Sequence, residues 1–182
     1  MDHSSVDRAP EILLSRYEIE RRVGELAAQI TRDYHGRTPH LVGILKGAWV
    51  FMADLVRRID IDVTIDFLGI TSYGSSTQSS GEVKITKDLD VSIENREVLI
   101  VEDILDTGRT LKYLEEVLSV HKPRSLRVVT LLDKRFRRIV PVQADYVGFE
   151  IADVFVVGYG LDFDQKYRQL PDIHVLRPVN TP

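Results

Sequence analysis

The sequence predicts an α/β fold, with a central, mostly parallel, twisted sheet flanked by helices. Runs at residues 40–45, 98–101 and 126–132 are almost entirely apolar, as is typical of parallel strands covered on both faces. The first two runs are each followed by apolar residues at helical spacing, and such strand-helix units favour right-handed crossovers within one sheet. With 182 residues and 43% apolar composition, we expect a single domain spanning residues 1–182.

The first expected element is a helix that begins near Ser15, because Ser15 and Glu18 have the spacing of a capping box. Its core face is formed by Ile19, Val23, Leu26, Ala27 and Ile30. The strand over residues 40–45 follows and ends at Lys46 and Gly47. A second helix comes next, with a core stripe of Trp49, Met52, Leu55, Val56 and Ile59.

Residues 61–68 alternate between apolar and other side chains, which predicts a half-buried strand. Its predicted buried face consists of Ile61, Val63, Ile65 and Phe67. A weaker alternation returns at Val83 and Ile85, so we expect an antiparallel pair. The residues between the two strands are almost all polar, which predicts a long exposed loop. That loop, at about 72–82, is either a flexible lid or filler.

Three further strands are expected over residues 126–132, 146–151 and 154–159. Charged side chains stand at the carboxyl ends of several strands: Lys46, Glu102, Asp103, Lys134 and Asp162. Open α/β sheets bind ligands at the carboxyl ends of their parallel strands. We therefore expect these charged residues to converge on one site.

Residues 98–111 are the most informative stretch. The apolar strand at 98–101 is followed by Glu102 and Asp103, and then by a turn at 106–110 that contains two threonines and a glycine. Leu111, Leu114, Val117 and Leu118 come after it at helical spacing. The turn should therefore lie at a helix N-terminus, where unpaired N–H groups and the helix dipole attract anions. This pattern predicts a phosphate site.

Other phosphate-binding motifs fit less well. A Walker A loop requires a glycine and a lysine where this chain has Asp103 and Arg109, and no G-x-G-x-x-G follows a predicted strand. A sugar monophosphate is therefore the better ligand. Glu102 and Asp103 could hold sugar hydroxyls or Mg²⁺, or could simply be the solvated start of a loop. Asp106 could cap the turn, or could accept a proton from a bound heterocycle.

Composition argues against several classes of function. The net charge of −4 and the pI near 5.7 leave no basic footprint for nucleic acid or for an anionic membrane. The absence of cysteine excludes disulfide and thiolate chemistry and fits a cytoplasmic location. No apolar run approaches the roughly 18 residues of a membrane span, and the N-terminus is unlike a secretory signal. The five histidines have no metal-ligand spacing.

Residues 98–111 resemble the phosphoribosyl pyrophosphate motif of the type I phosphoribosyltransferases. Three more segments of the chain extend the resemblance: 45–47, Ser72 with Tyr73, and 155–162 followed by Arg168. In this order and spacing they are similar to the hypoxanthine-guanine phosphoribosyltransferases, over nearly the whole chain. The resemblance implies the type I fold, in which a small hood, here about residues 150–182 with the N-terminal segment, covers the base.

The implied reaction belongs to purine salvage: hypoxanthine or guanine and phosphoribosyl pyrophosphate give IMP or GMP and pyrophosphate. The residues implied to bind phosphoribosyl pyrophosphate are Lys46, Gly47, Ser72, Tyr73, Glu102, Asp103, Asp106, Thr107, Gly108, Arg109, Thr110 and Arg168. Those implied to bind the purine are Lys134, Phe155, Val156 and Asp162. Mg²⁺ is the implied cofactor, with Glu102, Asp103 and Asp162 as its expected ligands. Relatives form homodimers or homotetramers.

Two of these residues are implied to be catalytic. Asp106 would accept a proton at purine N7, and Lys134 would donate a hydrogen bond to the 6-oxo group. A cis peptide bond is common before the residue that matches Lys46. Two positions depart from the usual pattern: Ala48 replaces glycine or serine, and Arg109 replaces the lysine of mammalian relatives.

Three other functions remain open at this point. The first is a transferase that prefers xanthine or another base, which the contacts to the purine edge would decide. The second is a regulatory protein that keeps the phosphoribosyl pyrophosphate pocket and reads RNA. The acidic chain, together with Asp106 and Lys134, counts against it. The third is a receiver-type signalling domain, which would need neither Lys134 nor Phe155.

Overall fold

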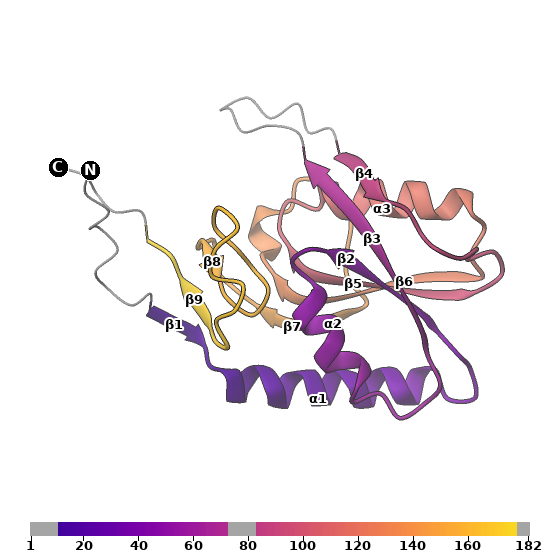
Figure 1. Cartoon of the computed structure of the whole chain (residues 1–182), viewed down its shortest axis with the longest axis horizontal. Helices are drawn as coiled ribbons and strands as arrows, with labels where there is room; N and C mark the ends of the chain where they lie inside the picture. Colours follow the sequence, from indigo (N-terminus) through magenta and orange to yellow (C-terminus); the bar gives the residue numbers. More distant parts are fainter. Residues whose placement is uncertain (1–10, 73–82, 178–182) are drawn as a thin grey trace.

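The structure, a computed structural model of the chain, describes residues 11–72 and 83–177. Its main sheet has six strands in the order β4-β3-β2-β5-β6-β7, and a smaller sheet has the order β1-β9-β8. In the main sheet all neighbouring strands are parallel except β3 and β4, which pair antiparallel at one edge. The predicted mostly parallel α/β sheet is confirmed (Figure 1).

The helices are α1 (Arg16–Asp33), α2 (Trp49–Val56) and α3 (Arg109–Val120), with a 3₁₀ turn η1 (Arg135–Arg137). The main sheet contains β2 (His40–Leu45), β3 (Thr64–Ser72), β4 (Val83–Lys87), β5 (Glu97–Leu105), β6 (Ser125–Asp133) and β7 (Tyr146–Glu150). The smaller sheet contains β1 (Glu11–Leu14), β8 (Val156–Val157) and β9 (Ile173–Val175). No helix in the described ranges is long and apolar enough to cross a membrane.

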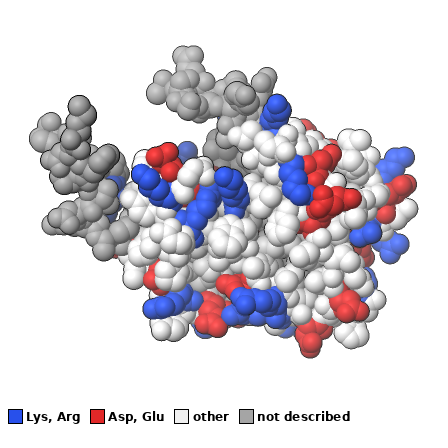
Figure 2. All heavy atoms as spheres, viewed as in Figure 1, with Lys and Arg blue, Asp and Glu red and all other residues white. Residues whose placement is uncertain are grey.

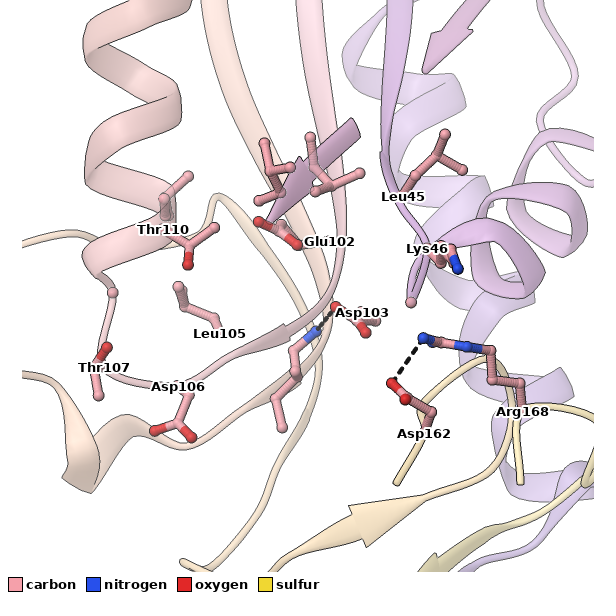
Figure 3. Close-up of a pocket in the computed structure, with 16 residues that line it drawn as sticks. Leu45, Lys46, Glu102, Asp103, Leu105, Asp106, Thr107, Thr110, Asp162 and Arg168 are labelled. Atoms are coloured by element: carbon pink, nitrogen blue, oxygen red, sulfur yellow. Dashed lines mark hydrogen bonds and ion pairs between the residues drawn. The ribbon is translucent and has the colours of Figure 1, made fainter. Parts of the chain in front are cut away.

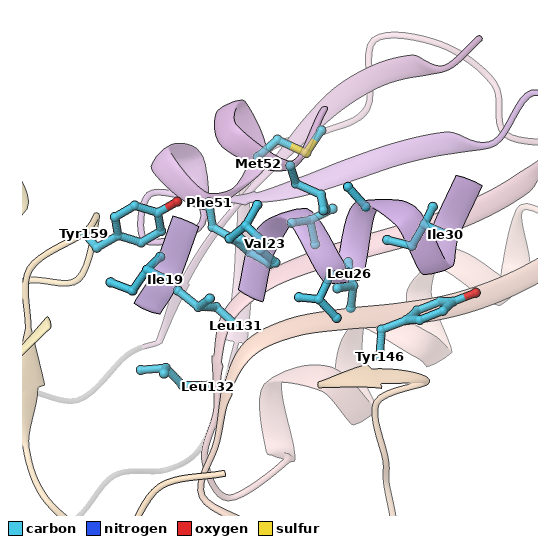
Figure 4. Close-up of a cluster of buried hydrophobic side chains, with 14 of the residues drawn as sticks. Ile19, Val23, Leu26, Ile30, Phe51, Met52, Leu131, Leu132, Tyr146 and Tyr159 are labelled. Carbon is cyan, nitrogen blue, oxygen red and sulfur yellow. The ribbon is translucent and has the colours of Figure 1, made fainter. Parts of the chain in front are cut away.

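Each face of the main sheet has its own apolar core. α1 and α2 cover one face, where their buried side chains pack against residues such as Leu99 and Leu131 (Figure 4). α3 covers the other face, against residues such as Val98 and Ile100. Consecutive residues of β5 thus contribute to opposite cores, which explains why the run at 98–101 is apolar throughout.

The capping box predicted at the start of α1 is present. The Glu18 N–H donates to the Ser15 hydroxyl at 3.4 Å, and the Ser15 N–H donates to a Glu18 carboxylate oxygen at 2.8 Å. The five residues expected on the core face of α1 are all buried: Ile19, Val23, Leu26, Ala27 and Ile30. The helix is therefore held by its cap at one end and by its apolar stripe along its length.

The small sheet joins the two ends of the described chain. β1 pairs with β9, and β9 pairs with β8, both antiparallel. The Arg16 N–H also donates to the Asp172 carboxylate at 2.7 Å, across 156 positions of sequence. β1 and β9 have four and three residues, too few to show a periodic pattern in the sequence, and so they were not predicted. The strand expected at 154–159 is reduced to the two residues of β8.

The prediction for residues 61–68 was partly wrong. β3 begins only at Thr64, and Ile65, expected in the core, is 52% exposed. Asp66, expected on the exposed face, is buried. The reason is that Asp66 accepts hydrogen bonds from the N–H groups of Phe67 and Asp90, which satisfy the carboxylate inside the fold. Of the loop predicted at about 72–82, Ser72 ends β3, and residues 73–82 lie outside the described residues.

Strand β5 also differs from its prediction. It continues past residue 101 to Leu105, because its ladder with β6 extends to the pairs Ile104 with Leu132 and Leu105 with Asp133. Glu102 therefore lies within the sheet and is buried, with 5% of its surface exposed. The alternative in which Glu102 is the solvated start of a loop is wrong.

Candidate active site

A cavity of about 320 Å³ lies at the carboxyl ends of β2 and β5. Figure 3 shows the residues around it, which come from the end of β2, from β3 and β5, from the turn before α3 and the start of that helix, and from the loop after β8. The predicted site residues that line it are Lys46, Gly47, Glu102, Asp103, Asp106, Thr107, Gly108, Thr110, Asp162 and Arg168. Ten of the residues predicted from separate stretches of sequence thus meet at one cavity.

Two glycines allow the backbone segments around the cavity to approach closely. A Cβ atom at Gly47 would lie 1.6 Å from a carboxylate oxygen of Asp103. A Cβ at Gly160, where φ is +99°, would lie 2.3 Å from the Gly47 carbonyl oxygen. A Cβ at Gly160 would therefore clash with backbone, and a Cβ at Gly47 would displace the Asp103 carboxylate. The Leu45–Lys46 peptide bond is cis, as the resemblance implied.

The acid pair near the end of β5 is largely withdrawn from solvent, with Glu102 buried and Asp103 half-buried. Burial, together with the neighbouring Asp103 carboxylate, raises the pKa of Glu102 well above its ordinary range. Burial also raises the pKa of Asp103 to about 6, although the Ile104 N–H donates to its carboxylate at 2.8 Å. Both shifts mean that negative charge here is poorly compensated by the protein alone. A cation or a set of ligand hydroxyls would relieve this.

The donor set fits Mg²⁺ only in combination with a ligand. Within the described residues no three acidic or histidine side chains gather closely enough to hold a metal ion by themselves. The Arg168 guanidinium lies 2.8 Å from an Asp162 carboxylate oxygen and neutralises part of the negative charge of Asp162 (Figure 3). Mg²⁺ usually takes one or two carboxylates and completes its shell with water and substrate phosphates. The acidic end of the cavity suits that arrangement.

The turn at 106–110 has the features of an anion site. Gly108 has φ of +86° and is the N-cap residue of α3, so the free N–H groups of the first helical turn lie beside it. Thr107, Gly108 and Thr110 line the cavity. Arg109, also predicted to bind phosphoribosyl pyrophosphate, is exposed and does not line the cavity.

Asp106 lies at the edge of this cavity beside two cations. Lys134, which is buried, places its ammonium 3.7 Å from one carboxylate oxygen. The Arg137 Nε lies 2.8 Å from the other oxygen, Oδ1, but within the described residues no donor is aligned to form a hydrogen bond with that buried atom. Arg137 also binds Asp153 at 2.9 Å. The carboxylate thus has a charged neighbour on each side.

Arg137 and Asp153 were not predicted from the sequence. Arg137 belongs to the basic run at 134–138, and no periodic pattern marks which of its residues turns toward Asp106. The 3₁₀ turn η1 decides this, because residues three apart on such a turn lie on the same side. Asp153 reaches the site from the loop between β7 and β8, where it lies 3.9 Å from Lys134.

The other predicted site residues lie nearby or outside the description. Phe155 is half exposed and packs edge-to-face against Phe163, with ring centroids 5.7 Å apart. Phe155 and Val156 belong to the small sheet and its approach and do not line the cavity. For Ser72 only the backbone, at the end of β3, is described, and Tyr73 lies outside the described residues.

Comparison with known proteins identifies the family. Residues 11–164 match the family described as the phosphoribosyl transferase domain. The chain belongs to this family. It is 52% identical over 93% of its length to a hypoxanthine-guanine phosphoribosyltransferase of Bacillus subtilis, 94% of which is covered. A protein of the same name from Staphylococcus aureus is 53% identical, with 92% of this chain and 94% of the relative covered.

Solved structures agree with this assignment. A hypoxanthine phosphoribosyltransferase from Staphylococcus aureus superposes with a TM-score of 0.90 at 51% identity and covers 97% of both chains. One from Trypanosoma cruzi, solved as a ternary complex with substrates, has a TM-score of 0.85 at 44% identity, with 92% of this chain and 95% of that chain covered. The predicted resemblance and the type I fold are confirmed, and the receiver-type alternative is wrong.

Proposed function

We propose that this chain transfers the phosphoribosyl group of phosphoribosyl pyrophosphate to hypoxanthine or guanine, giving IMP or GMP and pyrophosphate in purine salvage. The observation that carries the proposal is that the turn at 106–110, the acid pair and Asp106 border one cavity, with the Lys134 ammonium 3.7 Å from the Asp106 carboxylate. This geometry occurs in a chain 52% identical to a hypoxanthine-guanine phosphoribosyltransferase.

The sugar phosphate would bind along the sheet edge. The turn at 106–110 offers N–H groups and two threonine hydroxyls to the 5′-phosphate. Glu102 and Asp103 offer carboxylate oxygens to the two ribose hydroxyls, and hydroxyl donors would satisfy these buried acceptors. Pyrophosphate would lie toward Gly47, with Lys46 and Arg168 contributing positive charge.

The base would lie against Asp106 and Lys134. In a 6-oxopurine, N7 and the 6-oxo oxygen are adjacent on one edge, and the two side chains, 3.7 Å apart, can address both at once. The Lys134 ammonium donates to the oxygen, and the Asp106 carboxylate accepts the proton. During transfer the bond from ribose C1′ to pyrophosphate breaks and the bond from N9 to C1′ forms. Phe155 would stack on the ring.

The same pair explains a preference among bases. Adenine has an amino group where hypoxanthine has the 6-oxo oxygen, and an ammonium donor cannot pair with another donor. Lys134 would therefore exclude adenine. Hypoxanthine, guanine and xanthine share the 6-oxo group, so this contact does not separate them.

Mg²⁺ would be held by Asp103 or Asp162 together with pyrophosphate oxygens and water. When bound, the ion neutralises charge on the departing pyrophosphate. We propose that residues 1–182 work as one domain, with a hood at about 150–182. A dimeric or tetrameric assembly, a cytoplasmic location and a lid at 72–82 remain predictions from the sequence and the family resemblance.

One assay tests the proposal. The protein is incubated with Mg²⁺, phosphoribosyl pyrophosphate and one base at a time: hypoxanthine, guanine, xanthine, adenine or uracil. Nucleotide from hypoxanthine or guanine is expected, and none from adenine. If no base gives a nucleotide, the enzyme proposal is wrong. If xanthine alone reacts, the proposed substrate is wrong.

A further inference from the structure

Arg138 and Ile139, which follow the 3₁₀ turn η1, contact the turn at 106–110 from one side. The Ile139 N–H donates to the Thr107 carbonyl at 3.1 Å. The Arg138 guanidinium donates both to the Asp106 carbonyl and to the Asp133 carboxylate. Two consecutive carbonyls of the turn are therefore held from one side by residues 138 and 139.

This anchoring sets the direction of two N–H groups. The Leu45–Lys46 bond is the one cis peptide in the described ranges, so the peptides after Asp106 and Thr107 are trans. In a trans peptide the N–H points opposite to the C=O. The N–H groups of Thr107 and Gly108 therefore point away from residues 138 and 139. Thr107 and Gly108 both line the cavity. Within the described chain neither N–H has an acceptor.

The Arg138 side chain is also packed against the turn. A Cβ atom at Gly108 would lie 2.8 Å from Arg138 Cδ and 2.6 Å from Val142 Cγ2. The turn therefore packs directly against the side chains of Arg138 and Val142. The Arg138 and Asp133 side chains are only 14% and 9% exposed. Asp133 binds Nη2 and so holds the planar guanidinium in one orientation, with Nη1 directed at the Asp106 carbonyl.

We propose that Arg138, oriented by Asp133, is a positioning residue for the 5′-phosphate. By holding the Asp106 carbonyl it keeps two backbone donors directed at the phosphate, and its buried charge adds to the attraction of the turn for an anion. Arg138 itself does not touch the ligand. The inference rests on the proposed function, because it assumes that this turn binds the 5′-phosphate of a nucleotide.

Equilibrium titration with GMP and guanosine, which differ only in that phosphate, tests the inference. For the wild-type protein the ratio of the guanosine Kd to the GMP Kd measures the contribution of the phosphate. R138Q is expected to lower this ratio by about tenfold or more, since one charge-assisted contact to the turn is lost. R138K keeps the charge but loses the planar guanidinium, and is expected to lower the ratio of the two Kd values by about threefold.

R135Q is the matched control. Arg135 lies on the same 3₁₀ turn but is 69% exposed and pairs with Glu150 at 3.6 Å, away from the anion turn. For R135Q the ratio of the guanosine Kd to the GMP Kd is expected to equal that of the wild type. If R138Q leaves the ratio unchanged, or weakens both ligands equally, the inference is overturned.

Folding and function are separated by two further measurements. Circular dichroism identifies any variant that is unfolded, and R138K then provides the test in place of R138Q. In steady state, the KM for phosphoribosyl pyrophosphate should rise in R138K while the KM for hypoxanthine changes by less than about twofold. If the wild-type protein itself binds GMP no more tightly than guanosine, the proposed function fails before this inference is reached.

Discussion

At the scale of single residues, the most informative side chain is Asp106. A carboxylate beside a phosphate site is unfavourable unless it has another task. The structure gives it two cationic neighbours, Lys134 at 3.7 Å and Arg137 at 2.8 Å. These contacts hold the carboxylate between two cations at the edge of the cavity. They also mean that Arg137 must share Asp106 with any base that binds.

Replacing Asp106 with asparagine tests its role as proton acceptor. The amide keeps the shape but cannot take a proton, so we expect turnover to fall on the order of 10²-fold or more. Thermal unfolding should change little, since the side chain lies at the edge of a cavity. D153N is the matched control. Asp153 contacts the same two cations as Asp106, Lys134 and Arg137, but its side chain is 56% exposed. Equal turnover in wild type and D106N would remove Asp106 from the mechanism.

Gly47 provides a second test at this scale. In Gly47→Ala the new methyl group would lie 1.6 Å from Asp103 Oδ2, so either the acid or the loop must move. We expect activity to be lost and phosphoribosyl pyrophosphate to bind at least about tenfold more weakly.

Gly24→Ala is the control for that substitution. Gly24 lies within α1 and a Cβ there meets nothing within 4 Å. This change should stabilise the protein by about 0.5–1 kcal/mol and leave activity intact. Full activity in the Gly47 variant would show that the close approach to Asp103 is not needed.

At the scale of elements, the hairpin of β3 and β4 is pinned by one buried carboxylate. Burial alone would raise the pKa of Asp66, but N–H donors from Phe67 and Asp90 and the Lys87 ammonium outweigh it, so the pKa lies below its ordinary 3.8. These contacts join β3 to Lys87 at the end of β4 and to Asp90 in the segment that follows β4.

The sign of this shift gives a pH prediction. Because the pKa of Asp66 is lower in the folded state, its stabilisation is present above pH 3.8 and is lost as the pH falls through the folded-state pKa. D66N should lower the free energy of unfolding at pH 7 by about 1–3 kcal/mol. In urea titrations the gap from wild type should shrink below about pH 4. D62N, at an exposed position of the preceding loop, should have no such effect. A gap that persists at low pH would contradict the role of the charge.

At the scale of the whole molecule, the small sheet and the main sheet share one core. The cluster that contains the buried residues of α1 and α2 also includes four residues of β8, the loop after it and β9: Val156, Tyr159, Leu161 and Ile173. The Tyr159 hydroxyl also donates to Asp54 of α2 at 2.6 Å, and burial raises the pKa of that tyrosine. Over the face seen in Figure 2, acidic and basic side chains are interspersed.

A shared core predicts cooperative unfolding. Trp49 is the single tryptophan of the chain and begins α2, so its fluorescence reports one region, while circular dichroism reports the whole. The two urea transitions should coincide. In Tyr159→Phe both should shift together, by about 1 kcal/mol, because one buried hydrogen bond is lost. Separate transitions would contradict the single-domain proposal.

The parts of the fold that the sequence predicted are those with a strong local signal. The apolar runs, the capping box and the helical stripes predicted β2, the first part of β5, α1, α2 and α3, because periodicity and burial act along a continuous stretch. In α2 the prediction was partly wrong, since Trp49 of its expected core stripe is 49% exposed and Ile59 lies beyond the end of the helix at Val56. The same holds for the turn at 106–110, whose glycine and threonines are adjacent in the chain.

The tertiary structure alone decided what depends on distant partners. β1 and β9 are too short to carry a pattern and exist because they pair with each other. β5 extends past Val101 because β6 continues alongside it. Asp66 is buried because Asp90 supplies a donor, and Arg138 reaches the Asp106 carbonyl because η1 turns beneath the site. In each case the free energy comes from contacts that sequence spacing does not encode.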